Sequence, residues 1–122
     1  MKVLENIEPK VVWNYFEDIC KVPRPSKKEE KIIQFLIDFG KKHNLETKRD
    51  EIGNVLIKKP ATKGKENIKT VVLQSHIDMV CEKNEGTKHD FDKDPIQPFI
   101  DGEWVKAKVV PLAFTHSPSI KG

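Results

Sequence analysis

The stretch VVLQSHIDMV, residues 71–80, decides the fold that the sequence predicts. Residues 70–74 form a short apolar run, and such runs are typical of strands that are covered on both faces in α/β sheets. In open α/β sheets, functional groups gather just beyond the carboxyl ends of the strands. His76 and Asp78 stand at that point. The stretch therefore predicts an α/β fold and, at the end of its strand, a candidate site.

Two helices are predicted ahead of this strand. Apolar side chains at helical spacing indicate a first helix over residues 10–20, which two prolines then end. A second helix is predicted over residues 27–43, with four apolar residues on one face: Ile32, Phe35, Leu36 and Phe39. Ser26 and Glu29 have the spacing of a capping box, in which the serine hydroxyl accepts a hydrogen bond from the amide of Glu29. We therefore expect Ser26 to cap the second helix.

Two hairpins complete the predicted elements. The first joins strands near residues 45–50 and 54–58, and the second, near residues 97–107, turns at Asp101-Gly102. We expect an α/β architecture in which the N-terminal helices pack on a mixed sheet. That sheet would include residues 45–58 and 70–75.

The composition argues against several classes of function. The chain has 122 residues and a net charge of +3, from 22 basic and 19 acidic residues. The two signs are interspersed, whereas nucleic-acid binding favours a one-sided basic stripe. No apolar run is long enough to cross a bilayer, and the N-terminus does not have the pattern of a signal peptide. We expect a cytoplasmic protein with no nucleic-acid or membrane partner.

The two cysteines, Cys20 and Cys81, have neither a metal-binding nor a redox spacing. We expect two reduced, partly buried thiols, as in a reducing compartment. A thiol nucleophile at Cys81, with His76 nearby in the sequence, stays open as an alternative, although no other feature of the sequence supports it.

His76 and Asp78 have the chemistry of a metal site. A neutral imidazole is a good zinc ligand, and metal-bound histidines commonly donate their other N–H to a carboxylate. A carboxylate two residues along an extended segment reaches the same side. The alternative is a structural hydrogen-bonded pair, because a metal site needs three or four ligands.

The other candidate ligands are weaker. We expect His43, His89 and His116 to be solvated residues. Asp90, Asp92 and Asp94 alternate in the sequence and suggest calcium binding, but the loop lacks the glycine and the terminal glutamate of a calcium-binding loop.

Four segments in order resemble the aminoacyl-histidine dipeptidases, a family of co-catalytic zinc peptidases. The match covers roughly residues 5–108, and its segments are VWNYFEDICKVPRPSKKEEKI, RDEIGNVLIKKPA, VVLQSHIDMVCEKN and HDFDKDPIQPFIDGEWVKAK. The most specific part is HIDMVCEKN followed by HDF and DGEWV. The resemblance implies the N-terminal part of a zinc-peptidase catalytic domain.

The resemblance also implies roles for individual residues. His76 matches a zinc ligand, and Asp78 matches the catalytic aspartate that orients a ligand imidazole. In such a family, two zinc ions hold and activate the water that attacks a dipeptide carbonyl, with a glutamate as general base. That glutamate and the remaining ligands do not fall within the matching span.

The match ends at Lys108. The family typically continues with Gly-Thr-Thr-Leu-Gly-Ala-Asp-Asn-Gly, whereas this sequence reads Val-Val-Pro-Leu-Ala-Phe-Thr, and no acidic residue follows Glu103. We therefore expect residues 1–108 to be part of a dipeptidase catalytic domain and residues 109–122 to be a divergent tail.

On this interpretation the chain lacks the aspartate of that family segment, which bridges the two metals, and it also lacks the general base and the dimerisation region of the family. We therefore expect the chain alone to be inactive. A shifted reading frame, a fragmentary gene and a genuine short protein are the competing explanations. The alternative function is a non-catalytic α/β module that binds a partner chain through an open sheet edge.

Overall fold

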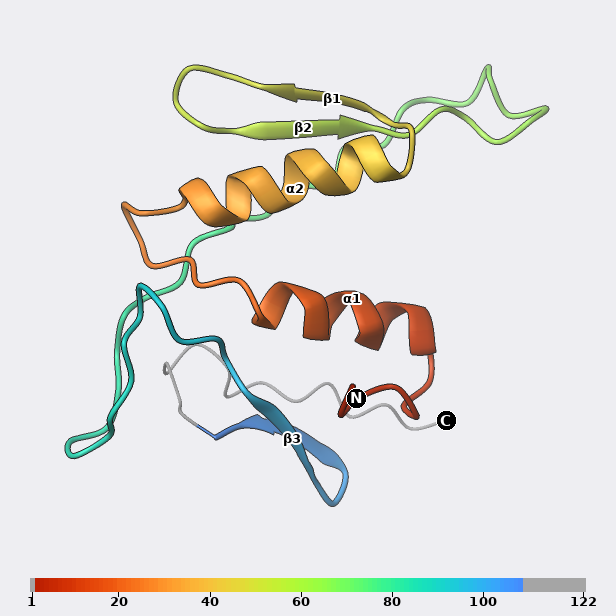
Figure 1. Cartoon of the computed structure of the whole chain (residues 1–122). Coiled ribbons are helices and arrows are strands. Elements are labelled where there is room, and N and C mark those ends of the chain that lie inside the picture. Colours follow the sequence, from red (N-terminus) through yellow and green to blue (C-terminus); the bar gives the residue numbers. More distant parts are fainter. Residues whose placement is uncertain (1, 109–122) are drawn as a thin grey trace.

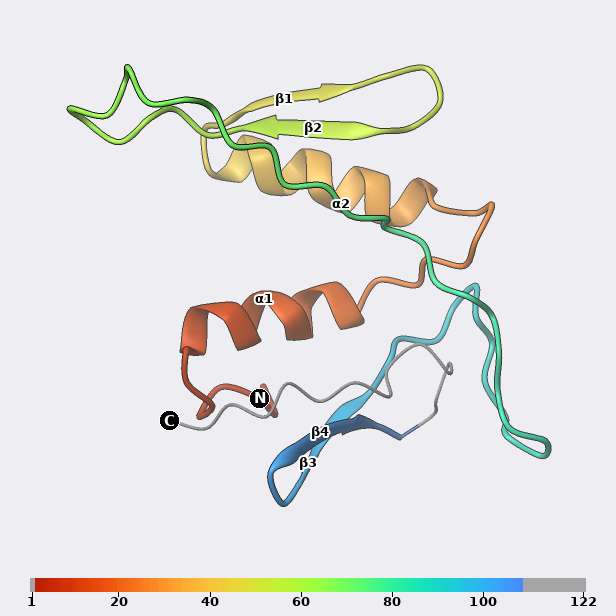
Figure 2. The same ribbon diagram turned by 180° about the vertical axis from the view of Figure 1, so that it is seen from behind.

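A computed structural model of the chain describes residues 2–108. The predicted divergent tail, residues 109–122, lies outside the described residues, as does His116. The elements in chain order are α1 (Lys10–Cys20), α2 (Glu30–Lys42), β1 (Glu46–Arg49), β2 (Val55–Lys58), β3 (Pro98–Asp101) and β4 (Trp104–Ala107). Figures 1 and 2 show α2 between the β1–β2 hairpin and α1, with the β3–β4 hairpin beyond α1.

Most of the predicted local elements are confirmed. Helix α1 has the predicted bounds, and both hairpins form with antiparallel register, Thr47 opposite Ile57 and Ile100 opposite Val105. Helix α2 begins at Glu30, later than predicted, and no side chain caps its N-terminus. The predicted capping role of Ser26 is therefore wrong, because its hydroxyl is engaged elsewhere in the molecule.

The predicted mixed sheet is wrong. The described residues form two separate antiparallel sheets of two strands each. Residues 70–74 have no strand partner among the described residues, and the side chains of Val71, Val72 and Leu73 are 79%, 78% and 91% exposed. A strand exists only through hydrogen bonds to its neighbours, and none of the described strands pairs with this segment.

Helix α2 packs on the β1–β2 hairpin, and it carries two of the four buried apolar residues of the described chain. Ile32 and Ile33 are 2% and 6% exposed. Gly40 allows the close approach of helix and hairpin, because a methyl group in its place would overlap the side chain of Thr47. At the other end of α2, Arg49 of β1 forms a two-pronged ion pair with Glu30, at 2.7 and 2.8 Å.

The N-terminal residues are tied to α1 by a buried carboxylate. Glu17, only 5% exposed, accepts hydrogen bonds from the backbone N–H groups of Val3 and Leu4 at 2.9 and 3.0 Å. Leu4 is fully buried beside it in the core. The pair of bonds satisfies a carboxylate that would otherwise be costly to bury.

Both cysteines are free thiols, and they differ in environment. Cys20 is buried at the end of α1, and burial raises the pKa of its thiol to about 11. Cys81 is exposed, so the expectation of a partly buried thiol is wrong at this position. Among residues 2–108, no helix has the length and apolar character needed to cross a membrane.

Candidate functional site

The structure brings His76 and Asp78 into direct contact. Nδ1 of His76 lies 2.9 Å from Oδ1 of Asp78 and 3.1 Å from its backbone oxygen. The two residues are on the same side of an extended segment, as their spacing predicts. The His76 side chain is 83% exposed, which leaves the far side of its ring open to solvent.

Ser26 completes this cluster, and the sequence analysis missed it. The Ser26 hydroxyl donates a hydrogen bond of 2.6 Å to Oδ2 of Asp78, although the two residues are 52 positions apart. The bonds from Ser26 and then from His76 hold the pKa of the Asp78 carboxyl below its ordinary value. Asp78 is therefore an ionised carboxylate with both oxygens engaged.

Backbone pairing brings these segments together. Pro25 and Met79 form an isolated parallel bridge, in which Met79 donates its N–H to Arg24 and Ser26 donates its N–H to Met79. The two hydrogen bonds measure 2.9 and 3.1 Å. The bridge holds the neighbouring residues of both segments in place, so the side chains of Ser26 and Asp78 come within hydrogen-bonding distance.

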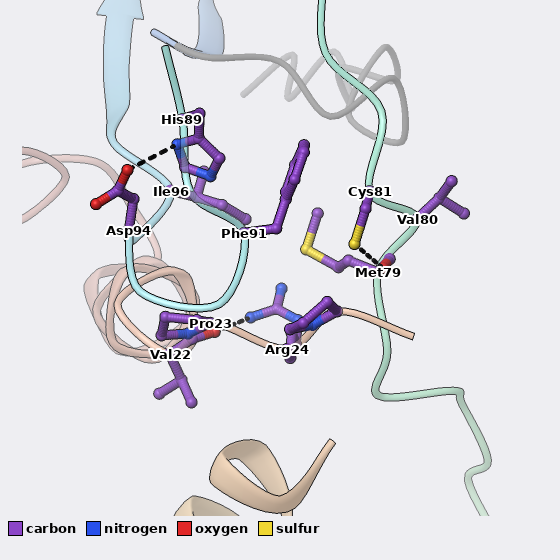
Figure 3. Close-up of a pocket in the computed structure, with 11 residues that line it drawn as sticks. Val22, Pro23, Arg24, Met79, Val80, Cys81, His89, Phe91, Asp94 and Ile96 are labelled. Carbon is purple, nitrogen blue, oxygen red and sulfur yellow. Dashed lines mark hydrogen bonds and ion pairs between the residues drawn. The ribbon is translucent and has the colours of Figure 1, made fainter. Parts of the chain in front are cut away.

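A small apolar cavity of about 20 Å³ lies behind the bridge. Figure 3 shows Met79 and Phe91 facing it, with Arg24 and Cys81 at its walls. Its volume is that of roughly one water molecule, so it does not hold a dipeptide. The residues that line it include Pro25 and Met79, which form the bridge next to Asp78.

The remaining histidines do not join the cluster. His43 is exposed just after α2, as predicted, where its ring contacts Phe39. His89 is not solvated as predicted, because its side chain is only 6% exposed and packs edge-on against Phe91. Its Nδ1 lies 4.0 Å from Oδ2 of Asp94.

The three aspartates of the nearby loop are engaged in other contacts. Asp90 accepts the N–H of Asp92, Asp94 accepts the N–H of Asp90, and Asp92 pairs with Lys28 at 2.7 Å. Within residues 2–108, no group of three or more potential ligand side chains is placed to hold a metal ion. The described part of the chain thus supplies the two members of the predicted site and no further ligand set.

Comparison with known proteins places this geometry in context. Over 108 residues, or 88% of the chain, the sequence is 51% identical to the cytosol non-specific dipeptidase of Escherichia coli (strain K12), of which it covers 22%. The crystal structure of aminoacylhistidine dipeptidase from Vibrio alginolyticus matches with a TM-score of 0.83 and 53% identity, over 87% of this chain and 22% of that one. No family model matches the chain.

The two comparisons agree with each other and with the resemblance inferred from the sequence motifs. A TM-score of 0.83 at 53% identity also shows that the described fold is that of the matching part of a dipeptidase. The chain spans about a fifth of the length of these relatives. It is therefore a partial homologue of the aminoacylhistidine and cytosol non-specific dipeptidases.

Proposed function

We propose that residues 1–108 are part of the catalytic domain of a metal-dependent dipeptidase that hydrolyses Xaa-His and related dipeptides. The 51% identity to a protein named as a dipeptidase is the observation that carries this proposal. The direct contact between His76 and Asp78 supports it, because a ligand imidazole oriented by a carboxylate is a common arrangement in metal enzymes.

The residues present suit one position of a zinc site. The ring of His76 is open to solvent on the side away from Asp78, and we assign it as a metal ligand. Asp78 holds the ring in place. When bound, zinc would supply an activated water for attack on the peptide carbonyl. The other ligands and the general base would come from polypeptide beyond residues 1–108.

The names of the relatives bear on substrate and location. One relative is named as non-specific and the other as an aminoacylhistidine dipeptidase, so we propose a broad range of dipeptides that includes Xaa-His. A cytosolic location is proposed from the name of the first relative. We also propose that the 122 residues alone lack hydrolase activity, because their described part does not assemble a complete ligand set.

A chimera tests the catalytic proposal. Residues 1–108 would replace the matching stretch of the Escherichia coli dipeptidase, and hydrolysis would be measured on a panel of dipeptides with and without zinc. We expect zinc-dependent activity in the chimera and none in the 122-residue chain. His76→Ala should reduce kcat/KM by at least about 100-fold, more than the loss of a residue that only supports a ligand.

His43→Ala is the matched control, because it removes an exposed imidazole that lies outside the cluster. It should leave zinc dependence unchanged. A folded chimera that binds zinc but hydrolyses no dipeptide, or full activity in His76→Ala, would contradict the proposal.

A second candidate function is a non-catalytic module that pairs with another polypeptide. The observation that favours it is the exposure of Val71, Val72 and Leu73 in a segment without a strand partner among the described residues. Unpaired apolar segments are templates for strand addition. The partner would be a chain equivalent to the remaining four fifths of the relatives.

Binding of the full chain to the Escherichia coli dipeptidase lacking its matching stretch tests this candidate. Leu73→Lys should abolish the complex, and Ile52→Lys is the control, because Ile52 is 90% exposed in the β1–β2 turn. A stable complex without peptidase activity supports the module, and an active complex supports the dipeptidase. Equal binding by both variants argues against strand pairing.

A further inference from the structure

We propose that Ser26 is a positioning residue for the candidate metal ligand His76, acting through the carboxylate of Asp78. This inference rests on the proposed function, since it assigns Ser26 to the same site. Ser26 does not contact His76, and its effect would pass through one carboxylate whose two oxygens serve different partners.

The hydrogen bonds define the arrangement. Oδ2 of Asp78 accepts the Ser26 hydroxyl at 2.6 Å, while Oδ1 lies 2.9 Å from Nδ1 of His76. An ionised carboxylate only accepts hydrogen bonds, so Nδ1 must carry the proton. In the neutral ring, the lone pair is then on Nε2, the atom that faces away from Asp78 and is free to bind a metal.

Ser26 is itself held firmly. Its backbone N–H donates to the oxygen of Met79 at 3.1 Å, and the N–H of Met79 donates to Arg24 at 2.9 Å. These bonds lie on either side of the Pro25–Met79 bridge and fix the position of the Ser26 side chain. Without the hydroxyl, the Asp78 carboxylate could rotate, because its side chain is 35% exposed.

The local backbone around Ser26 is built for this contact and not for capping. Residues 25–28 form a turn closed by a hydrogen bond of 2.9 Å from Lys28 N–H to the Pro25 oxygen. Lys27 has φ +70°, a conformation that residues with side chains rarely adopt, and Glu29 accepts its N–H at 2.6 Å. Such a conformation persists only where surrounding contacts fix it, and these sites are often functional.

The side chain of Glu29 thus stabilises the turn, while the hydroxyl of Ser26 is hydrogen-bonded to Asp78. A capping serine would have engaged the start of α2, which has no side-chain cap. The helix therefore forgoes the stabilisation that a capping serine gives. The hydroxyl is used at the candidate site instead.

The first test measures the tautomer of His76 in the full chain without metal. Imidazole ¹⁵N chemical shifts, recorded at a pH of about 8.5, about two units above the reference pKa of a peptide histidine, distinguish Nδ1–H from Nε2–H. The His76 signals are identified by their loss in His76→Gln. We expect Nδ1–H in the unsubstituted chain. In Ser26→Ala, the ratio of Nδ1–H to Nε2–H should fall about fivefold, the effect of one hydrogen bond of typical net strength.

Two variants separate positioning from general damage. Ser26→Thr keeps a hydroxyl and should restore the tautomer ratio. Ser75→Ala makes the same chemical change one residue from His76 at an exposed position, and it should have no effect. An unchanged ratio in Ser26→Ala, or equal changes in Ser26→Ala and Ser75→Ala, overturns the proposal.

A second test decides the role of Ser26 even if the chain alone folds poorly. In the chimera described above, Ser26→Ala should lower zinc affinity about tenfold, at the low end for outer partners of metal ligands, and Ser26→Thr should recover it. If the parent chimera binds zinc and Ser26→Ala binds it equally well, the role of Ser26 is refuted and the proposed function stands. If the parent chimera binds no zinc, the proposed function fails, and the tautomer measured in that folded chimera still decides the role of Ser26.

Discussion

The packed unit of α2, β1 and β2 and the extended segment at residues 70–74 both carry apolar side chains, but the environments of these side chains differ. In the packed unit, Ile32 and Ile33 of α2 are 2% and 6% exposed, and Ile33 lies beside Gly53 at the hairpin turn. In the extended segment, Leu73 is 91% exposed, and no described strand pairs with the segment.

The difference shows that apolar sequence alone does not make a core. The packed unit contains its own partners, because the helix and the hairpin that cover each other lie within 30 residues of sequence. A continuously apolar strand needs a neighbour on each edge and a layer on each face. The described residues provide no strand neighbour for residues 70–74, and Val71, Val72 and Leu73 are exposed.

The largest expected loss of stability comes from a substitution in the packed unit. Ile32→Ala should lower the free energy of unfolding by about 2–5 kcal/mol, since it leaves a cavity in the core. Leu73→Ala should change it by less than about 0.5 kcal/mol, as for exposed surface substitutions. Urea unfolding followed by circular dichroism compares the two variants, and similar losses would show that residues 70–74 are buried in solution.

A smaller effect is expected at the contact between α2 and β1. Gly40→Ala should destabilise the chain by about 1–3 kcal/mol through overpacking against Thr47, although alanine is normally the better helix former by about 1 kcal/mol. Combining it with Thr47→Ala should recover part of the loss. Stabilisation by Gly40→Ala alone would mean that helix and hairpin lie further apart.

The smallest effect concerns pH and the β1–β2 turn. Asp50 accepts N–H bonds from residues 52–54 and a side-chain bond from Asn54. The Asn54 side-chain bond, followed by the backbone bonds, lowers the pKa of Asp50 below its ordinary 3.8. The stabilisation is therefore complete above pH 3.8 and is lost as pH falls through the lower pKa of the folded state.

Amide chemical shifts of residues 52–54 measure this directly. They should stay constant from pH 7 to about 4 and change only below the ordinary pKa of aspartate. Asp50→Asn should remove the transition. A transition at or above pH 3.8 in the unsubstituted chain would show that the turn does not form as described.

The fold was predictable where its causes are local. The helical spacing of Ile32, Phe35 and Phe39 determines α2, and Gly53 and Gly102, both with positive φ, mark the two hairpin turns. The pairing of residues 70–74 was not predictable in the same way. Their composition indicates burial on two faces, but the elements that would bury them are not among the described residues.

The contacts of the candidate site also fall into those that the sequence predicts and those that it does not. The contact between His76 and Asp78 follows from a spacing of two residues, so the sequence predicts it. The contact from Ser26 crosses 52 positions, and the local capping pattern pointed to a different use of the hydroxyl. His89 was expected in solvent because its loop is charged, yet its ring packs against Phe91 and lines the cavity.

The bonds from Val3 and Leu4 to Glu17 have a practical consequence for anyone producing this protein. The first residues are part of the folded structure, so a shortened expression clone that begins at residue 5 would leave the Glu17 carboxylate buried without these two donors. Such a clone should yield insoluble material. A purification tag belongs ahead of residue 1 on a flexible linker, where it leaves both donors in place.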